Sequence, residues 1–476
     1  MSKIPGFTTQ NPSTEEFLSE YFYDSPKALE NKIEQLSKEF SVWRLQSIEQ
    51  RLEVLSLVLN RLKKEENELA KMISLEMGKP LAESIAEVKK CYSIFEYYER
   101  VAPILLAEKK IKTSYDKSLV SFEPLGVVLS IMPWNYPLWQ VLRFAVPAWL
   151  SGNVILLKPA EITSETSLIF ERLVREATGR SLVLNVQLST TTIEELYSLP
   201  DIKAVTFTGS TEVGRRVGML AGKNLKKSVL ELGGNDAYIL DESADIEKSV
   251  DFCLSAKLVN NGQSCIAAKR FFVPEAQKEN FLDLFVRGLL IKKIGDPFAS
   301  GVELGPLAHK RFHSRAALQA KKLELLLDKD SSQKELWEKL KQRVLPEKGF
   351  YYPPQCFVVN SGQGWSEEDF YKSFQREEIF APIALVYVYN SEEELYHRVN
   401  QSPYGLGAAW FGDPEKFQKT QVAKKIDVGM LSVNEMLRSD ARVPFGGIKD
   451  SGYGRELGEQ GLFEFCSVRT LHWGKY

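Results

Sequence analysis

The 476-residue chain is long enough for two or three domains, each with its own hydrophobic core. Its 61 lysine and arginine residues nearly balance its 63 aspartate and glutamate residues, so no basic excess points to nucleic acid or an anionic membrane as a partner. The most apolar stretch, LGVVLSIM, is far shorter than the roughly 20 residues that a membrane-spanning helix needs, and the first twelve residues lack the apolar run of a signal peptide. We therefore expect a soluble, cytoplasmic protein.

The first hundred residues have a helical pattern. Apolar residues recur at spacings of three and four over 29–40 and again over 52–62, with charged residues between them. The Gly-Lys-Pro segment at 78–80 interrupts this pattern and excludes a long coiled-coil seam. The periodicity therefore predicts helices that pack on the protein's own sheet.

From about residue 118 the pattern changes to strands. The segment SLVSFEPLGVVLSI is rich in β-branched residues, and the apolar runs VILLKP, AVTFTGS and SVLELGG each precede or follow a helical stretch. This alternation predicts an α/β fold with a parallel sheet and right-handed crossovers, and its recurrence after residue 265 predicts a second α/β domain. The charged stretch 328–347 predicts a surface helix or loop, and the alternating C-terminal segment FEFCSVRTLHW predicts an edge strand.

Five cysteines are spread widely along the chain: Cys91, Cys253, Cys265, Cys356 and Cys466. Their odd number and the lack of a C-x-x-C pair argue against a disulfide framework and against a zinc site. His309 and His313 are four residues apart, but the glutamate of the H-E-x-x-H pattern is missing, so no metal is expected.

Cys265 in NNGQSCIA and Glu231 in VLELGGND are the candidate nucleophile and base. A thiolate needs local positive potential, and a carboxylate among apolar and glycine neighbours can act as a base of raised pKa. No histidine lies near either residue in the sequence, which argues against a cysteine–histidine hydrolase. A nearby carboxylate, backbone dipoles or a cationic cofactor would have to activate the thiol. Taken alone, Cys265 also fits a buried, unreactive side chain.

Two strand ends carry candidate cofactor ligands. GSTEVG at 209–214 follows the run AVTF and opens a helix, where free backbone N–H groups bind phosphate, although a plain strand-to-helix turn fits equally well. Lys158 and Glu161 in LLKPAE would lie at the carboxyl edge of the sheet, where open α/β folds bind ligands. A carboxylate there suits ribose hydroxyls and repels a 2′-phosphate, although a solvated ion pair is the competing interpretation.

Three further motifs have both a functional and a structural interpretation. The two prolines of PWNYP at 133–137 fix a loop on which the Asn135 amide could donate to an oxyanion, and the alternative is a turn with aromatic core residues. EEIFAP offers Glu378 and Phe380, and the glycine-rich segment that begins PFGG carries Phe445. Each of these two segments alone would be a loop.

Taken in order, PWNYP, KPAE, FTGSTEVG, ELGGN, GQSC, EEIFAP and PFGG make the chain resemble the NAD(P)-dependent aldehyde dehydrogenase superfamily from about residue 8 to the C-terminus. Within it, the chain looks most like bacterial succinate-semialdehyde dehydrogenases. The resemblance implies a Rossmann-type NAD(P)-binding domain (1–110 and 127–232), an α/β catalytic domain (233–449) and a strand arm for oligomerisation (111–126 and 455–473). It also implies a homodimer or homotetramer.

The resemblance implies that an aldehyde, most of all succinate semialdehyde, is oxidised through a cysteine thiohemiacetal and thioester, which Glu-activated water hydrolyses. Cys265 would be the nucleophile, Asn135 and the Cys265 N–H the oxyanion donors, and Glu231 the general base. The implied cofactor is NAD, with NADP as the alternative, and its ligands are Lys158, Glu161, Trp134, Gly209, Ser210, Glu378 and Phe380. Competing hypotheses are a broader aldehyde specificity, transfer of the acyl group to coenzyme A, and a non-catalytic structural protein on the same scaffold.

The chain departs from the family pattern near both ligands. The segment NVQLSTTTIEEL lacks the glycines that the family often has on the adenine side, and Val259 stands where some succinate-semialdehyde enzymes have an arginine. Arg143 matches an arginine that binds the substrate carboxylate, and Phe445 is a further substrate-binding candidate. Arg438 and Arg442 could supply, beside Arg143, a second positive charge for the substrate carboxylate.

Overall fold

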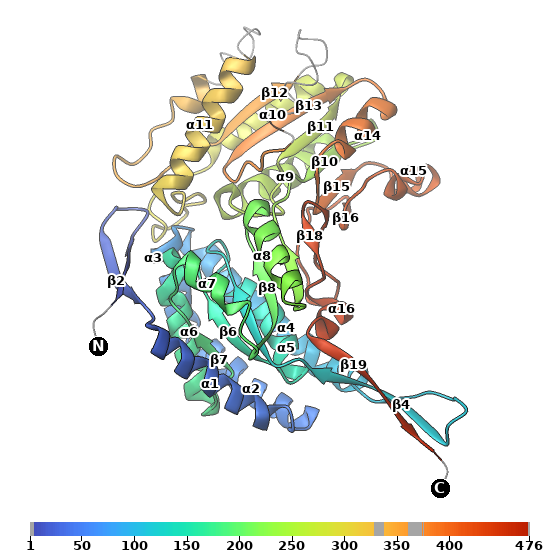
Figure 1. The fold of residues 1–476 in the computed structure, drawn as a ribbon. Helices are drawn as coiled ribbons and strands as arrows, with labels where there is room; N and C mark the ends of the chain where they lie inside the picture. The colour runs from blue at the N-terminus through green and yellow to red at the C-terminus, as the bar shows by residue number, and fades with distance from the viewer. Residues whose placement is uncertain (1–3, 328–337, 360–373, 375, 475–476) are drawn as a thin grey trace.

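The computed structural model describes residues 4–327, 338–359, 374 and 376–474. Two α/β halves lie one above the other, and a strand arm extends from the lower half, which contains most of the N-terminal 232 residues (Figure 1). The α/β fold expected from the strand–helix alternation is confirmed. Residues 328–337 of the predicted charged surface segment at 328–347 lie outside the described residues, and the described part, 338–347, is mostly exposed. In the described part of the chain, no helix combines the length and apolar character that a bilayer crossing requires.

The first half is built on a six-stranded sheet with the order β18-β9-β8-β5-β6-β7. Its strands are β5 Val127–Ile131, β6 Val154–Lys158, β7 Val183–Asn185, β8 Ile202–Thr208, β9 Lys227–Glu231 and β18 Gly452–Tyr453. The strands β5 to β9 are parallel, and β18 pairs with β9 in the antiparallel direction. Because both faces of a parallel sheet are covered, these strands are almost continuously apolar.

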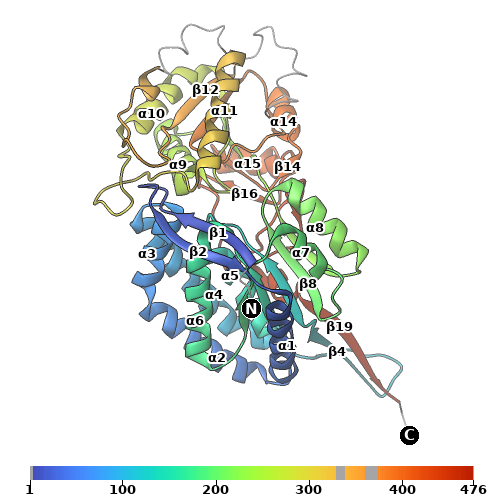
Figure 2. The ribbon, with the colours of Figure 1, turned by 60° about the vertical axis from the view of Figure 1, so that its left-hand side comes forward.

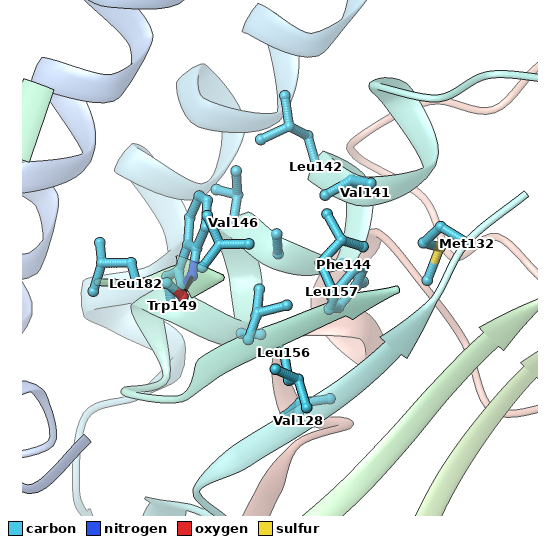
Figure 3. Close-up of a cluster of buried hydrophobic side chains, with 14 of the residues drawn as sticks. Val128, Met132, Val141, Leu142, Phe144, Val146, Trp149, Leu156, Leu157 and Leu182 are labelled. Atoms are coloured by element: carbon cyan, nitrogen blue, oxygen red, sulfur yellow. Dashed lines mark hydrogen bonds between the residues drawn. The ribbon is translucent and has the colours of Figure 1, made fainter. Parts of the chain in front are cut away.

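The helices of the first half are α1 Pro26–Trp43, α2 Ile48–Lys64, α3 Glu66–Met77, α4 Leu81–Leu105, α5 Trp139–Leu150, α6 Ser164–Thr178, α7 Thr190–Leu196, α8 Thr211–Lys223 and α16 Gly458–Phe463. The predicted break at 78–80 is where α3 ends, on Gly78 with φ +81°. All twelve residues of α5 are buried, and Figure 3 shows its side chains packed against β5 and β6. Polar residues on α5 therefore need partners inside the protein.

The second half is built on a six-stranded parallel sheet with the order β12-β13-β11-β10-β15-β16. Its strands are β10 Ala237–Leu240, β11 Arg270–Pro274, β12 Gln355–Val359, β13 Ile383–Tyr389, β15 Gly407–Phe411 and β16 Met430–Val433. Its helices are α9 Ile246–Leu258, α10 Lys278–Ile291, α11 Lys310–Leu327, α14 Glu392–Asn400 and α15 Pro414–Lys419. Residues 259–269, which include Cys265, connect α9 to β11 and contact Asn135 of the first half.

The arm is a three-stranded antiparallel sheet of β3 Lys109–Lys110, β4 Lys117–Pro124 and β19 Cys466–Trp473. The strand β19 lies at the edge of this sheet and is mostly exposed, as its alternating sequence predicts. The arm projects away from both halves (Figure 1). Within the segment 455–473 that was expected to form the arm, α16 instead packs against α5.

The prediction of helix is wrong for the first residues, which form a hairpin of β1 Ile4–Gln10 and β2 Phe17–Tyr23. This N-terminal hairpin lies across the front of the first half, close to the second half (Figure 2). Tyr21 donates to Glu165 at 2.9 Å, and the backbone of Phe350 donates to the carbonyl of Pro12 at 2.9 Å. These partners are far away in the sequence, so local periodicity could not reveal the hairpin.

Candidate functional site

The carboxyl ends of neighbouring parallel strands in the first half bring most of the candidate residues to one edge of the sheet. The segments that follow β5, β6, β8 and β9 carry Trp134 with Asn135, Lys158 with Glu161, Gly209 with Ser210, and Glu231 at the strand end itself. This edge is where ligands bind in open α/β sheets. The predicted residues therefore share one region, although their places in the sequence span a hundred positions.

Two cavities border Cys265. A large cavity of about 590 Å³ is lined by residues of α4, α5 and α9 and of the segment 436–445, including Arg143 and Phe445. A small cavity of about 150 Å³ is lined by Trp134, Asn135, Gly209, Ser210, Glu378 and Phe380 among others. Cys265 and Gln140 line both cavities. A molecule in either cavity would therefore reach the thiol.

The segment before Cys265 has an unusual backbone. Asn260, Asn261 and Gly262 all have positive φ angles, of 54°, 57° and 74°. Asparagine tolerates this conformation better than most residues, and its side chain can stabilise it through hydrogen bonds. Asn261 donates to the carbonyl of Pro306 and accepts from the N–H of Gly305, while Asn260 donates to the carbonyl of Asn135 at 2.8 Å. The Asn-Asn-Gly sequence therefore holds the cysteine loop in a fixed position.

Burial raises the pKa of the Cys265 thiol to about 12, and the positive charges of Arg143 and Lys269 oppose that rise. Lys269 is fully buried and donates to the carbonyls of Ser264 and Cys265 at 2.7 and 2.5 Å. Its Nζ also lies 3.7 Å from Glu378. Sequence reasoning missed Lys269, although a lysine four residues after a candidate nucleophile is a signal that could have identified it.

Asn135 is held by hydrogen bonds on both sides of its amide. Its Nδ2 donates to the carbonyl of Gln263 at 2.9 Å, and its Oδ1 accepts from Gln140 at 2.8 Å. The loop that carries it leads into α5, where Glu87 of α4 accepts from the N–H groups of Leu138 and Trp139, both at 3.0 Å. The amide is therefore fixed beside the residues that precede Cys265.

Lys79 and Glu87 form a buried ion pair beneath this loop, and Lys79 also donates to the carbonyl of Asn135 at 3.3 Å. In the sequence, Lys79 belongs to the predicted helix break at 78–80, and no role was predicted for Glu87. The charge of Lys79 could have indicated a buried partner, because a helix boundary at Gly78 and Pro80 does not itself require a lysine.

Glu231 ends β9 in an apolar and acidic environment. Both carboxylate oxygens are buried and accept no hydrogen bond from the described residues. Desolvation by burial, reinforced by Glu456, raises the pKa of Glu231 well above its usual value, and Arg143 and Arg455 oppose this rise. A Cβ on Gly446 would lie 2.6 Å from Glu231 Oε1, so only glycine leaves room there. Glu231 is not among the described residues that line the two cavities; it shares with Cys265 the electrostatic influence of Arg143.

The candidate substrate ligands differ in their surroundings. Arg143 is buried, forms an ion pair with Glu456, donates to Thr208 at 3.3 Å and lies 4.7 Å from the centre of the Phe445 ring. Arg438 lines the large cavity, but it is largely exposed and lies 3.5 Å from Glu435. Arg442 is exposed, pairs with Asp440, and is not among the described residues that line the cavity.

The candidate cofactor ligands fit a nicotinamide dinucleotide. Glu378 accepts from the N–H of Gly234 at 3.0 Å, and the Trp134 and Phe380 rings meet edge to face with centroids 5.8 Å apart. Ser210 begins α8 without a capping hydrogen bond from its side chain, so its hydroxyl and the first N–H groups of the helix can meet a phosphate. Among the described residues, no group of three His, Cys, Asp or Glu side chains is placed to hold a metal ion.

Lys158 and Glu161 lie beyond the small cavity, where β6 ends. Burial lowers the pKa of Lys158, and Glu161 opposes this effect. Glu161 accepts a hydrogen bond from the Tyr23 hydroxyl at 3.0 Å, so the N-terminal hairpin reaches the predicted ribose site. Sequence reasoning did not consider Tyr23, because nothing in the first residues indicates which distant carboxylate they contact.

Residues 2–471 match the Aldehyde dehydrogenase family. A probable succinate-semialdehyde dehydrogenase [NADP(+)] of Synechocystis sp. is 34% identical over 469 residues, covering 97% of this chain and 98% of that protein. Succinate semialdehyde dehydrogenase [NAD(P)+] Sad of Escherichia coli is 34% identical over 466 residues, covering 97% and 96%. The crystal structure of succinic semialdehyde dehydrogenase from Streptococcus pyogenes in complex with NADP+ superposes with a TM-score of 0.89 and 30% identity, covering 99% of this chain and all of that one.

Proposed function

The chain belongs to the aldehyde dehydrogenase family, and we propose that it oxidises succinate semialdehyde, or a similarly short aldehyde with a terminal carboxylate, to the dicarboxylic acid. The observation that carries this proposal is the large cavity, which Cys265 and the cationic Arg143 both border. Relatives named as succinate-semialdehyde dehydrogenases cover nearly the full chain and support the choice of substrate. Water is the second substrate and NAD(P)+ the oxidant.

In the first step, Cys265 attacks the aldehyde carbon and forms a thiohemiacetal. Because burial raises the pKa of the thiol to about 12, the thiolate needs added positive potential to form near neutral pH. When bound, a nicotinamide cofactor would supply a cationic ring and a hydride acceptor. The Asn135 amide and the Cys265 N–H would donate to the oxyanion, and the contacts of Asn135 with Gln140 and Gln263 hold that amide in place.

In the second step, a water molecule hydrolyses the thioester on Cys265. Glu231 is the proposed base, since its raised pKa makes it a stronger base than an exposed carboxylate. The Arg143–Glu456 ion pair lies near Glu231, where Glu456 raises the pKa of Glu231 and Arg143 lowers it. An acyl transfer to coenzyme A would not need this base, so the buried carboxylate favours hydrolysis.

For the cofactor, we propose that both NAD+ and NADP+ are accepted and that NAD+ is preferred. The Glu161 carboxylate, held by Tyr23, suits ribose hydroxyls and repels a 2′-phosphate. Lys158 and the nearby charge of Arg311 offset that repulsion in part. The relatives named for NADP+ or NAD(P)+ support acceptance of the phosphorylated form.

We further propose a cytoplasmic homodimer or homotetramer that assembles through the arm. The edge strand β19 leaves Val468 65% and Trp473 41% exposed, and an unpaired sheet edge with apolar side chains is suited to pairing with a second chain. Light scattering coupled to size-exclusion chromatography tests this assembly. A monomer at micromolar concentration would contradict it.

The decisive test of the activity is NADH or NADPH formation across a panel of aldehydes. Succinate semialdehyde should have a kcat/KM at least about tenfold above that of butanal, because a charge-assisted hydrogen bond to the carboxylate stabilises by about 1.5–3 kcal/mol. If butanal is the better substrate, the proposed specificity is wrong while membership of the family stands.

A further inference from the structure

One of the cationic side chains that line the large cavity, Lys90, was not among the site residues predicted from the sequence. Four cationic side chains line it: Lys90, Arg143, Lys292 and Arg438. Three of these have carboxylate partners, which are Glu456 for Arg143, Glu303 for Lys292 and Glu435 for Arg438. No carboxylate among the described residues lies within ion-pair distance of Lys90.

Lys90 is held at the cavity wall by two neutral contacts. Its Nζ donates to the Ser439 hydroxyl at 2.7 Å and lies 4.3 Å from the centre of the Trp139 ring. Both of these residues line the same cavity. A lysine ammonium has three N–H donors, so one bond to Ser439 leaves two for a ligand. The side chain is half-buried, which reduces the solvation of its charge.

Arg143 is less suited to meet a substrate anion directly. Its guanidinium already forms an ion pair with Glu456, contacts Thr208 and lies over Phe445, so its charge is largely neutralised and its position is fixed. Val259 also lines the cavity and adds no charge. Within the described lining, an incoming carboxylate would gain most from the cation that has no anionic partner.

We infer that Lys90 binds the terminal carboxylate of the substrate and thereby selects aldehydes with a negative charge at the far end. This inference rests on the proposed function, because it names the group that recognises the carboxylate of the proposed substrate. Lys90 is a specificity-determining residue here, and Ser439 and Trp139 position it. Arg143 stays paired with Glu456.

The test compares Lys90→Met, Lys90→Arg and Lys89→Met with the wild-type enzyme. Lys89 is the matched control, because it is the adjacent lysine of α4, is 60% exposed and lies 3.6 Å from Glu66. The measured quantity is kcat/KM for succinate semialdehyde divided by kcat/KM for butanal. We expect Lys90→Met to lower this ratio at least about tenfold, as removal of a charge-assisted hydrogen bond should. Lys90→Arg should retain most of the ratio, and Lys89→Met should not change it.

The outcomes separate the two proposals. If the wild-type enzyme prefers succinate semialdehyde and Lys90→Met keeps that preference, the role of Lys90 is wrong and the proposed function stands. If the wild-type enzyme has no such preference, the proposed function fails and the role of Lys90 fails with it. An equal loss for both aldehydes in Lys90→Met would show that Lys90 only supports the structure, which also overturns the inference.

A pH series on the wild-type enzyme needs no substitution and remains decisive if Lys90→Met does not fold. Burial lowers the pKa of Lys90 to about 8. The charged groups that influence it are Cys91 and Glu87 on its own helix, Arg143 on α5 and Asp440 on the loop that carries Ser439; Arg143 lowers the pKa of Lys90 and the other three raise it. Deprotonation removes the positive charge, so the preference for succinate semialdehyde over butanal should decline above about pH 8. A ratio that stays constant from pH 7 to pH 10 would overturn the inference.

Discussion

Replacement of Glu231 by glutamine should separate the two chemical steps of the reaction. Glutamine has nearly the same shape as glutamate but cannot remove a proton from water. The first turnover uses Cys265 and Asn135, so the rapid burst of NADH in a stopped-flow experiment should keep its amplitude of about one per site and a rate within a few-fold of wild type. Steady-state turnover should fall, because hydrolysis of the thioester loses its base.

The size of this loss follows from the surroundings of Glu231. Its two oxygens are buried, accept no hydrogen bond from the described residues and lie near Glu456, which together raise its pKa. A positioned general base contributes about 10²–10⁴-fold, or about 2.7–5.5 kcal/mol of transition-state stabilisation. We expect the turnover of Glu231→Gln to be about 10²–10⁴-fold lower than that of the wild-type enzyme. An equal loss in burst rate and turnover would refute this assignment of Glu231 to the second step.

The same environment sets the direction of the pH dependence. A base with a raised pKa loses its proton at a higher pH than an exposed carboxylate does, so wild-type turnover should rise with pH until the raised pKa is passed, while Glu231→Gln should lack this rise. The stability of the protein should change in the opposite direction. Because the folded-state pKa lies above the unfolded value, the contribution of Glu231 to stability is complete below the unfolded pKa and is lost as the pH rises through the folded pKa.

Gly446→Ala, whose new Cβ would lie 2.6 Å from Glu231 Oε1, should reproduce the loss of turnover, and normal turnover in that variant would argue against a fixed carboxylate.

Two further substitutions test the supporting contacts. Tyr23→Phe removes the hydrogen bond to Glu161, so KM for NAD+ should rise roughly three- to tenfold with little change in kcat, as measured by initial rates; an unchanged KM would place Glu161 outside the ribose site. Lys269→Met removes the buried cation that contacts the carbonyl of Cys265 and Glu378, so the free energy of unfolding in urea should fall by about 3–5 kcal/mol. A loss below about 1 kcal/mol would mean that Glu378 is protonated in the folded protein and does not need Lys269.

The sequence predicted those parts of the fold and site that short segments specify. Strand–helix alternation indicated the parallel sheets, and the segments around Cys265, Glu231 and Asn135 name the groups that lie near the cavities or the strand ends. Lys90 and Tyr23 were missed because their importance depends on a distant partner. A lysine on an amphipathic helix is ordinarily a solvated residue, and only the folded structure shows that the ammonium of Lys90 reaches Ser439, 349 positions later.

The charged partners of the candidate arginines also could not be predicted from the sequence. Arg143 could be aligned with a substrate ligand, but its ion pair with Glu456 depends on the return of the C-terminal segment to α5. The exposed positions of Arg438 and Arg442 likewise follow from a loop conformation that no local pattern indicates. Which of several positive charges remains available to a ligand is a property of the packed structure.

The N-terminal hairpin also has a consequence for biosynthesis. It leaves the ribosome before its partners, because Tyr21 and Tyr23 contact Glu165 and Glu161, and the loop between its strands contacts Phe350 and its neighbours. Tyr21 and Tyr23 therefore cannot dock until Glu161 and Glu165 have been translated, and the loop between the strands cannot dock until Phe350, more than two thirds of the way along the chain, has been translated. During that interval the aromatic side chains of the hairpin are open to chaperones and to other nascent chains, so the yield of native protein should depend on translation speed more than the stability of the finished fold would suggest.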